Sequence, residues 1–230
     1  MKIKFRAANK TVYNIRQKPI PASQLVPQWW KNMNNTVNNE GIKPSPFPSL
    51  TAKKCFPLLD AITAGYIVPL WADIYVEQRN NEPYVHWAVD QNVFEAWPWD
   101  QSSGYEIPEG YSQTVFKYVH GWIIETPKDY SCLIIHPIGY PNLPFRTLSG
   151  VVDTDLFKAF ANSPLVIKKG FEGIIEKGTP MFQVIPIKRD QWKLETDYLD
   201  DEETRIRVQQ LQTTMIASYA KFFRKNKKYE

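Results

Sequence analysis

The chain has 230 residues, 43% of them hydrophobic and 14% aromatic, and a formal net charge of +4. This content suffices for one folded domain with a sizeable core, which excludes a wholly disordered chain. No apolar run reaches the roughly 20 residues of a membrane-spanning helix, and the start of the chain lacks the apolar segment of a secretory signal, so we expect a protein that is neither membrane-bound nor secreted.

Residues 2–17 carry two short runs of alternating apolar and polar residues, separated by Asn9 and Lys10. Alternation of this kind predicts half-buried strands, and the Asn-Lys pair suits the turn between them. We therefore expect one or two strands at the start of the chain.

Residues 18–52 form a proline-rich segment, with prolines at positions 19, 21, 27, 44, 46 and 48. Proline lacks a backbone N–H and prevents regular hydrogen bonding, so we expect a long N-terminal arm that wraps over the body. Only the stretch around Pro27 looks locally ordered, because proline suits a first helical turn. Trp29, Trp30 and Met33 would then share one short apolar surface.

The next stretch changes its period from helical to extended. Phe56, Leu59 and Thr63 fit one or two helical turns, which Gly65 can end in a left-handed cap. From Tyr66 onward the sequence predicts a strand, and its internal proline indicates a sheet edge or a bulge.

Two hairpins are predicted further along the chain. Residues 114–127 and 130–139 are β-like stretches on either side of a Pro-Lys-Asp turn. Residues 163–178 form a second pair of apolar stretches around Gly170 and Gly173, which are placed for positive φ angles.

These stretches, together with the alternating residues 83–90 and the apolar residues 179–187, place turn signals about every 8 to 12 residues. Helices do not alternate with the predicted strands. The pattern predicts an all-β domain over residues 53–197, a β-sandwich, jelly roll or barrel.

Residues 198–230 predict the one long helix and a basic tail. Asp200 or Asp201 suits the N-cap, and acids follow in the first turn. Apolar residues repeat at spacings of 3, 4, 4 and 3 on one face: Val208, Leu211, Met215, Tyr219 and Phe222. Such a face docks either on the β body, which we favour, or on a partner.

The net charge lies in this tail. Five basic residues from Lys221 to Lys228 oppose only Glu230, and this balance equals the whole net charge. Residues 1–220 are therefore neutral overall, which does not indicate a nucleic-acid-binding face on the body. We expect a solvated tail that binds nucleic acid at most weakly.

Two cysteines, Cys55 and Cys132, lie far apart in apolar stretches. Isolated thiols in such contexts are typically buried and reduced. We expect two buried free thiols and a cytoplasmic compartment, or a virion assembled in one.

The histidines do not follow a metal-binding pattern. His86, His120 and His136 each lie on a predicted strand, and none is followed at the second position by an acid, as jelly-roll oxygenases require. Gly-rich phosphate loops and nucleophile elbows are also missing from the sequence. We expect no metal, no cofactor and no complete catalytic set.

Eight tryptophans raise the question of a sugar-binding face. Trp97 and Trp99 are the best candidates, because Pro98 and the polar loop that follows make full burial of both difficult. Aromatic residues of all-β proteins otherwise belong mostly to the core. Carbohydrate binding is therefore our weakest alternative.

Asp153 and Asp155 stand in the stretch LSGVVDTDLF. Residues at i and i+2 of a strand point to the same face, where two carboxylates repel unless water or a cation lies between them. Two interpretations remain open. The pair is either a solvated strand end or the rim of a polar pocket in which one carboxylate holds a water or a hydroxyl.

Several motifs resemble a family of uncharacterised proteins of tailed phages and some bacteria. They are GWIIETPKDYSCLIIHP, LSGVVDTD and IEKGTPMFQVIP in this order, preceded by KKCFPLLDAITAGYIVPL. The resemblance covers roughly residues 53 to 195. It implies a phage-type protein but names no activity.

The same segment resembles, more remotely, the core of dUTP pyrophosphatases and dCTP deaminases. The matching positions are Pro127 and Tyr130, the hairpin Gly150–Asp155, and Gly178 with Gln183. The resemblance implies a jelly roll in which Asp153 faces a sugar or an attacking water. It also implies that Gln183 or main-chain groups read a base, with Arg146 as a further contact.

The chain departs from that pattern at the phosphates. Residues 136–141, HPIGYP, stand where the family has an Arg-Ser phosphate clamp, and Leu156 and Phe157 replace the tyrosine under the deoxyribose. Without donors for three phosphates a triphosphate would not be stabilised. Any ligand should therefore be a nucleoside or a monophosphate-sized molecule, held between the hairpin and residues 177–183.

The sequence thus favours a non-catalytic protein of phage type, in a virion or in the host cytoplasm. It would contact protein partners, or itself, through the proline-rich arm and the C-terminal helix. The alternative is a dUTPase-like nucleotide-binding protein or enzyme that uses Asp153.

Overall fold

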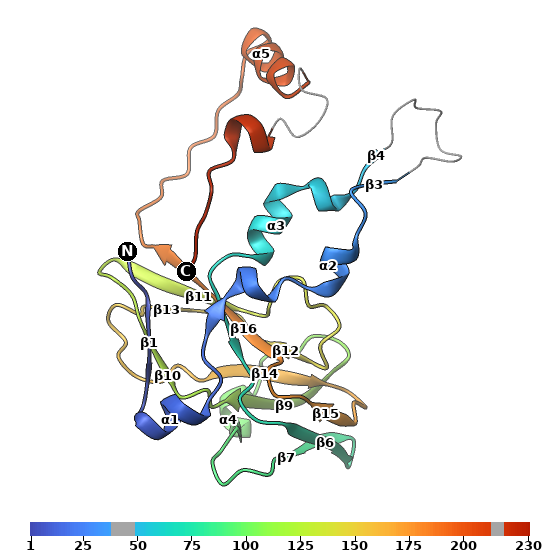
Figure 1. Cartoon of the computed structure of the whole chain (residues 1–230), viewed down its shortest axis with the longest axis vertical. Helices are drawn as coiled ribbons and strands as arrows, with labels where there is room; N and C mark the ends of the chain where they lie inside the picture. Colours follow the sequence, from blue (N-terminus) through green and yellow to red (C-terminus); the bar gives the residue numbers. More distant parts are fainter. Residues whose placement is uncertain (38–48, 213–218) are drawn as a thin grey trace.

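The computed structural model describes residues 1–37, 49–212 and 219–230, and it is built mostly of strands (Figure 1). Every strand pair among these residues is antiparallel, which confirms the predicted all-β class. The strands are β1 (Lys4–Ala7), β2 (Ile20–Pro21), β3 (Thr36–Val37), β4 (Ser49–Leu50), β5 (Tyr66–Pro69), β6 (Ile74–Arg79), β7 (Glu82–His86), β8 (Phe94–Ala96), β9 (Tyr111–Tyr118), β10 (Trp122–Glu125), β11 (Tyr130–Ile135), β12 (Phe145–Thr147), β13 (Gly150–Val152), β14 (Ser163–Lys168), β15 (Gly173–Ile175) and β16 (Pro180–Lys188). The helical segments are α1 (Lys10–Ile15), η1 (Ala22–Leu25), α2 (Gln28–Asn32), η2 (Ala52–Lys54), α3 (Phe56–Ile62), α4 (Trp99–Ser102), α5 (Asp201–Gln212) and η3 (Tyr219–Phe223).

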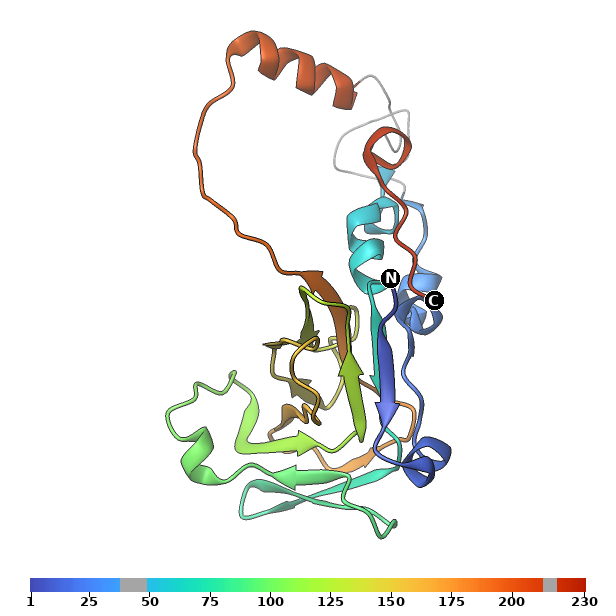
Figure 2. The ribbon, with the colours of Figure 1, turned by 90° about the vertical axis from the view of Figure 1, so that its left-hand side faces the viewer.

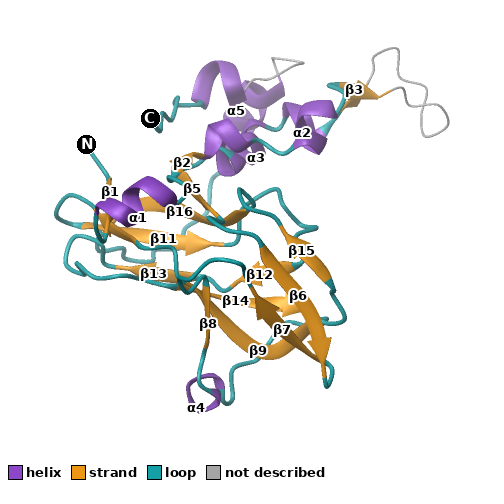
Figure 3. Cartoon of the chain, turned by 60° about the horizontal axis from the view of Figure 1, so that its bottom comes forward, coloured by secondary structure: helices purple, strands orange, loops and turns teal. Residues whose placement is uncertain are grey.

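Two larger sheets contribute to one hydrophobic core (Figure 3). The first has the order β13-β11-β16-β5-β2, and the second has the order β12-β14-β9-β8. Phe182 and Val68 of the first sheet belong to the same buried cluster as Phe116, Tyr118 and Leu165 of the second. The alternation that predicted strands therefore places one face of each sheet in this core.

The first predicted strand is present, but the second is wrong. Residues 10–15 form helix α1, because the Asn9 side chain accepts a hydrogen bond from the backbone N–H of Val12 at 2.9 Å and caps the helix. The same residues satisfy a helical period, since Val12 and Arg16 are both buried one turn apart.

The two predicted hairpins are also wrong, although their strands exist. β10 pairs with β1, while β11 pairs with β13 and β16. β14 pairs with β12 and β9, while β15 pairs with β6. Alternation identifies the face that a strand buries, but it does not identify the strand beside it.

The described part of the proline-rich segment packs on the body. Ala22 and Trp30 are buried, and the indole N–H of Trp29 donates to the carbonyl of Gly139 at 2.7 Å. The predicted helix begins after Pro27, as α2. Prolines 44, 46 and 48 lie outside the described residues.

Helix α3 and its end agree with the prediction. Gly65 follows the helix with a φ of +65°, which favours glycine. A Cβ atom at this position would lie 1.9 Å from the carbonyl oxygen of Val184 on β16. The glycine therefore allows the chain to turn from α3 into β5 against the neighbouring strand.

After β16 the chain leaves the sheets and returns (Figure 2). The predicted N-cap is present, since the Asp200 carboxylate accepts from the backbone N–H of Glu203 at 2.8 Å. The predicted docking of the apolar stripe on the body is not observed, because Val208, Tyr219 and Phe222 are 43%, 41% and 59% exposed. The side chains of Leu211 and Met215 lie outside the described residues.

The sequence predicts a solvated basic tail, but in the structure the tail is bound to the body. Arg224 and Lys227 both contact the carboxylate of Asp60 on α3, at 2.6 and 2.8 Å. The Tyr229 ring lies against the Tyr66 ring with centroids 6.0 Å apart. These contacts hold the end of the chain beside β5.

Both cysteines are free, but only Cys132 is buried, so the prediction of a buried Cys55 is wrong. Cys55 lies just before α3, at the exposed start of the helix. None of the helices in the described ranges has the length and hydrophobicity needed to cross a membrane.

Candidate functional site

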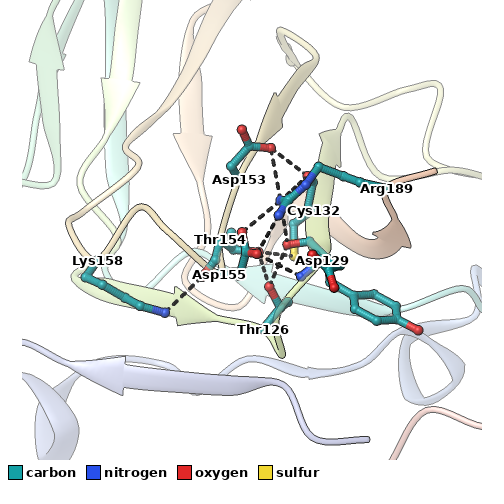
Figure 4. A network of polar contacts seen from close by, with 10 residues as sticks. Thr126, Asp129, Cys132, Asp153, Thr154, Asp155, Lys158 and Arg189 are labelled. Atoms are coloured by element: carbon teal, nitrogen blue, oxygen red, sulfur yellow. Dashed lines mark hydrogen bonds and ion pairs between the residues drawn. The ribbon is translucent and has the colours of Figure 1, made fainter. Parts of the chain in front are cut away.

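The acidic hairpin lies at one edge of the five-stranded sheet. β13 pairs on one side with β11, and the chain then turns through Asp153, Thr154 and Asp155 (Figure 4). Thr154 is buried, and its hydroxyl bonds to the Thr126 hydroxyl at 2.7 Å and to the Cys132 sulfur at 3.3 Å. Because β13 ends at Val152, Asp153 and Asp155 lie in the turn after the strand and not on the strand itself, where the prediction had them.

Arg189, which follows β16 directly, contacts both aspartates. Its guanidinium binds Asp155 through two hydrogen bonds, of 2.7 and 2.5 Å, and lies 3.4 Å from Asp153. A fork of this kind is the strongest form of carboxylate recognition. The sequence analysis does not single out Arg189, which stands between Lys188 and Asp190 and carries no local sign of its distant partners.

The Asp155 carboxylate is also bonded from the backbone. The N–H of Asp129 donates to it at 2.9 Å, and only 4% of its side chain is exposed. The hydrogen bonds from Arg189 hold the pKa of Asp155 down at about 2, and the Asp129 N–H acts in the same direction. Asp155 is therefore ionised at neutral pH, and both its oxygens accept hydrogen bonds from the protein.

Asp153 is the more accessible member of the pair. One carboxylate oxygen accepts from the Ser131 hydroxyl at 2.6 Å and faces Arg189, while 56% of the side chain remains exposed. The second oxygen is left for solvent or a ligand.

A depression of about 580 Å³ lies beside Asp153. It is lined by Val151, Val152, Asp153, Leu156, Phe157 and Ala161. Leu156 and Phe157 are 73% and 45% exposed. The pocket expected between the hairpin and residues 177–183 is not the one observed, because none of those residues lines this depression.

Gln183 has a structural role. It is fully buried, its oxygen accepts from the N–H of Ile138 at 2.9 Å, and its nitrogen donates to the carbonyls of Ala61 and Ala64. The amide thus ties β16 to the end of α3. With these groups occupied, the expectation that Gln183 reads a base is wrong.

Arg146 is not brought to the aspartates. It is exposed on β12, in the four-stranded sheet, and its charge helps to lower the pKa of His136, after the larger effect of burial. No contact joins it to Asp153 among the described residues.

The Trp97 ring is not an exposed surface on which a sugar could stack. Its ring is half-buried against the small apolar cluster of Val115, Leu148 and Val166. The Lys117 amine lies 5.3 Å from the ring centre. Trp99 begins α4, but its side chain is outside the described part of the structure.

The three histidines occupy separate surroundings. His120 is fully buried between the carbonyl of Ala161 and the N–H of Trp122, and burial lowers its pKa to about 4. His136 bonds to Tyr140 and Thr147, and His86 stacks on Tyr75. Within residues 1–37, 49–212 and 219–230, no three His, Cys, Asp or Glu side chains gather to hold a metal.

No protein-family model matches this chain, and no curated protein matches it. The resemblance to phage proteins and to dUTP pyrophosphatases therefore stays a hypothesis that rests on the motifs.

Proposed function

We propose that the protein is a non-catalytic binding protein of phage type, which contacts other protein chains in a virion or in the host cytoplasm. The observation that carries this proposal is the ion pair between Arg189 and Asp155. The same guanidinium lies 3.4 Å from Asp153, the carboxylate on which the dUTPase-like alternative depends.

A general base must accept a proton near neutral pH. Asp155 is poorly suited, because the Arg189 fork keeps its pKa near 2 and both its oxygens are engaged. One carboxylate oxygen of Asp153 accepts a hydrogen bond from the Ser131 hydroxyl and faces the same guanidinium. Arg189 therefore binds Asp155 through a fork and faces Asp153 as well, which is a strong charge-assisted arrangement within the protein.

The segment in place of a phosphate clamp is also engaged within the protein. The imidazole of His136 bonds to the N–H of Thr147 and to the carbonyl of Tyr140, and the Tyr140 hydroxyl donates to the carbonyl of Leu25 at 2.5 Å. Gly139 accepts from Trp29. These groups are therefore not directed at a triphosphate.

Exposed apolar side chains support the binding role. Leu156 at the acidic hairpin and Trp192 after β16 are 73% and 90% exposed. Leu156 lines one depression together with Val151 and Phe157, and contiguous apolar surface of this kind is typical of protein interaction sites.

A jelly roll of dUTPase type is part of the same proposal. Antiparallel sheets that share one core, and an acidic hairpin at a sheet edge, support it. Fold analogy of this kind carries no activity.

A small-molecule site is the second candidate, favoured by the depression beside Asp153. Its volume of about 580 Å³ falls within the range of roughly 300 to 1,000 Å³ common for ligand pockets. Its single exposed carboxylate could accept from a ribose or sugar hydroxyl. The ligand would be a nucleoside or a similar flat, uncharged molecule.

One set of measurements tests both candidates. Purified protein is assayed for dUTP and dCTP turnover and, in parallel, for thermal shifts with nucleosides, nucleotides and sugars, because a ligand of the folded state raises the melting temperature. We expect no turnover and no shift. Turnover that Asp153→Asn abolishes contradicts the non-catalytic proposal. A shift with a nucleoside that Leu156→Ser removes establishes the second candidate instead.

A further inference from the structure

The segment between β16 and α5, residues 190–200, is an extended arm that its own chain leaves uncovered. Trp192, Leu194 and Tyr198 are 90%, 88% and 86% exposed. The hydrogen bonds of residues 190–199 are local within the described part of the chain, for example from the N–H of Gln191 to Asp190. Figure 2 shows the arm passing clear of the sheets.

A second uncovered surface, formed by a free strand edge and exposed apolar side chains, lies at β13. This strand ends the five-stranded sheet, and its outer edge pairs with no other strand among the described residues. Such an edge offers free N–H and C=O groups to an extended segment. The depression beside it presents Val151, Leu156 and Phe157, which are 61%, 73% and 45% exposed.

The charges of the two surfaces are complementary. Residues 190–200 contain four acids and one basic residue, Lys193. A second depression of about 270 Å³ is lined by Lys2, Lys4 and Lys158, with Glu125. Glu125 already pairs with Arg6 at 3.5 Å, so the lysines give this surface its positive charge. Lys158 follows Phe157 directly and thus links the basic surface to the apolar one.

We propose that residues 190–200 of a second copy of this chain bind along the β13 edge and seat Trp192 in the apolar depression. This proposal rests on the binding function above and names its partner. The acids of the arm then face Lys158, Lys2 and Lys4, which favours this docking direction. Trp and Tyr are the residue types that most often anchor protein interfaces.

The occupant is a second copy because one copy leaves both surfaces open. The arm leaves the body at Arg189, which contacts Asp153 at the rim of the depression, yet Trp192 remains 90% exposed. When two copies exchange arms, both arms and both grooves are covered, and a reciprocal pair of this kind closes with twofold symmetry.

The oligomeric state tests the proposal. Light scattering with gel filtration is run on the wild-type chain, on an arm variant with Trp192→Ser, Leu194→Ser and Tyr198→Ser, and on a groove variant with Leu156→Ser and Phe157→Ser. We expect a dimer for the wild type and at least a tenfold weaker dimer for both variants. Tyr105→Ser is the matched control, since Tyr105 is 51% exposed and lines neither depression, and it should stay dimeric.

Disulfide trapping locates the contact in a Cys55→Ser background. A tagged chain with Trp192→Cys is mixed with an untagged chain carrying Phe157→Cys, and a mixed disulfide is expected on mild oxidation. A partner chain with Tyr105→Cys should not react. A wild-type monomer at all concentrations overturns the arm exchange, and so does a doubly substituted chain, Trp192→Cys with Phe157→Cys, whose disulfide closes within one chain and not between two. Neither outcome bears on dUTP turnover, so this proposal and the non-catalytic function fail separately.

Discussion

Asp153 and Asp155 differ in what their carboxylates can still bind, although both contact Arg189. Asp155 receives the guanidinium fork and a backbone N–H and is nearly buried, whereas Asp153 keeps one oxygen and more than half of its surface free. Any chemistry at this hairpin therefore depends on Asp153. The depressed pKa of Asp155 also means that its contribution to folding is present above about pH 4 and is lost only as the pH falls toward 2.

His120 predicts an acid sensitivity at milder pH. Its ordinary pKa of 6.5 falls to about 4 on burial, so below pH 6.5 the unfolded chain binds a proton that the folded chain excludes. The free energy of unfolding should therefore fall as the pH drops from 6.5 toward 4, by at most about 1.4 kcal/mol per pH unit from this group.

Urea unfolding at pH 7, 6 and 5 measures this slope. His120→Gln keeps a donor for Ala161 and an acceptor for Trp122 but removes the titration, so its slope should be flatter. His86→Gln makes the same substitution at a partly exposed histidine and is the matched control. An unchanged slope in His120→Gln would show that another group controls the acid sensitivity.

At the scale of elements, the sequence could predict the features that depend on neighbouring residues. Gly65 as the end of α3 and Asp200 as the cap of α5 depend on neighbouring residues only. Strand pairing is different, because β10 and β11 are adjacent in sequence but belong to different sheets. Arg189 was missed for the same reason, since its partner Asp155 lies 34 positions earlier in the chain. The sequence could identify the acidic pair but not the cation that neutralises it.

Gly65 also gives a test of how tightly α3 fits against β16. Gly65→Ala combines a left-handed φ with a Cβ atom 1.9 Å from the Val184 carbonyl oxygen, and backbone cannot move aside cheaply. We expect a loss of about 3 kcal/mol or more in the free energy of unfolding. Gly104→Ala is the control, because Gly104 has a φ of +79° but open space around it. Its loss should be about 1 kcal/mol, and equal losses in both variants would exclude the proposed clash.

At the scale of the whole molecule, the excursion after β16 is tied to the body at both ends by ion pairs. Arg189 holds its start to Asp155, and Arg224 with Lys227 holds its end to Asp60. Between these anchors the described residues include large exposed apolar side chains, of which Trp192 and Phe222 are examples. Fixed ends restrict the region that the arm can search, which favours one docking geometry over many.

The ion pairs that hold the end of the chain to Asp60 can be removed without changing the sheets. Asp60 is a nearly buried carboxylate whose pKa is lowered first by the hydrogen bond from Arg224, so Asp60→Asn removes the charge that both cations share. Hydrogen bonds to charged groups contribute about 1.5 to 3 kcal/mol, and the exposed Lys227 should contribute less. The detached tail should therefore be populated at least tenfold more in the variant, which limited trypsin digestion after Arg224 would report. Raising the salt concentration should move the wild type in the same direction.

Glu202→Gln is the control, because it breaks an exposed ion pair with Arg205 on α5 and should leave tail cleavage unchanged. Equal cleavage rates for Asp60→Asn and wild type, at matched melting temperatures, would mean that the contacts of Tyr66 with Tyr229 and Glu230, and of Arg224 with Phe56, suffice to hold the tail.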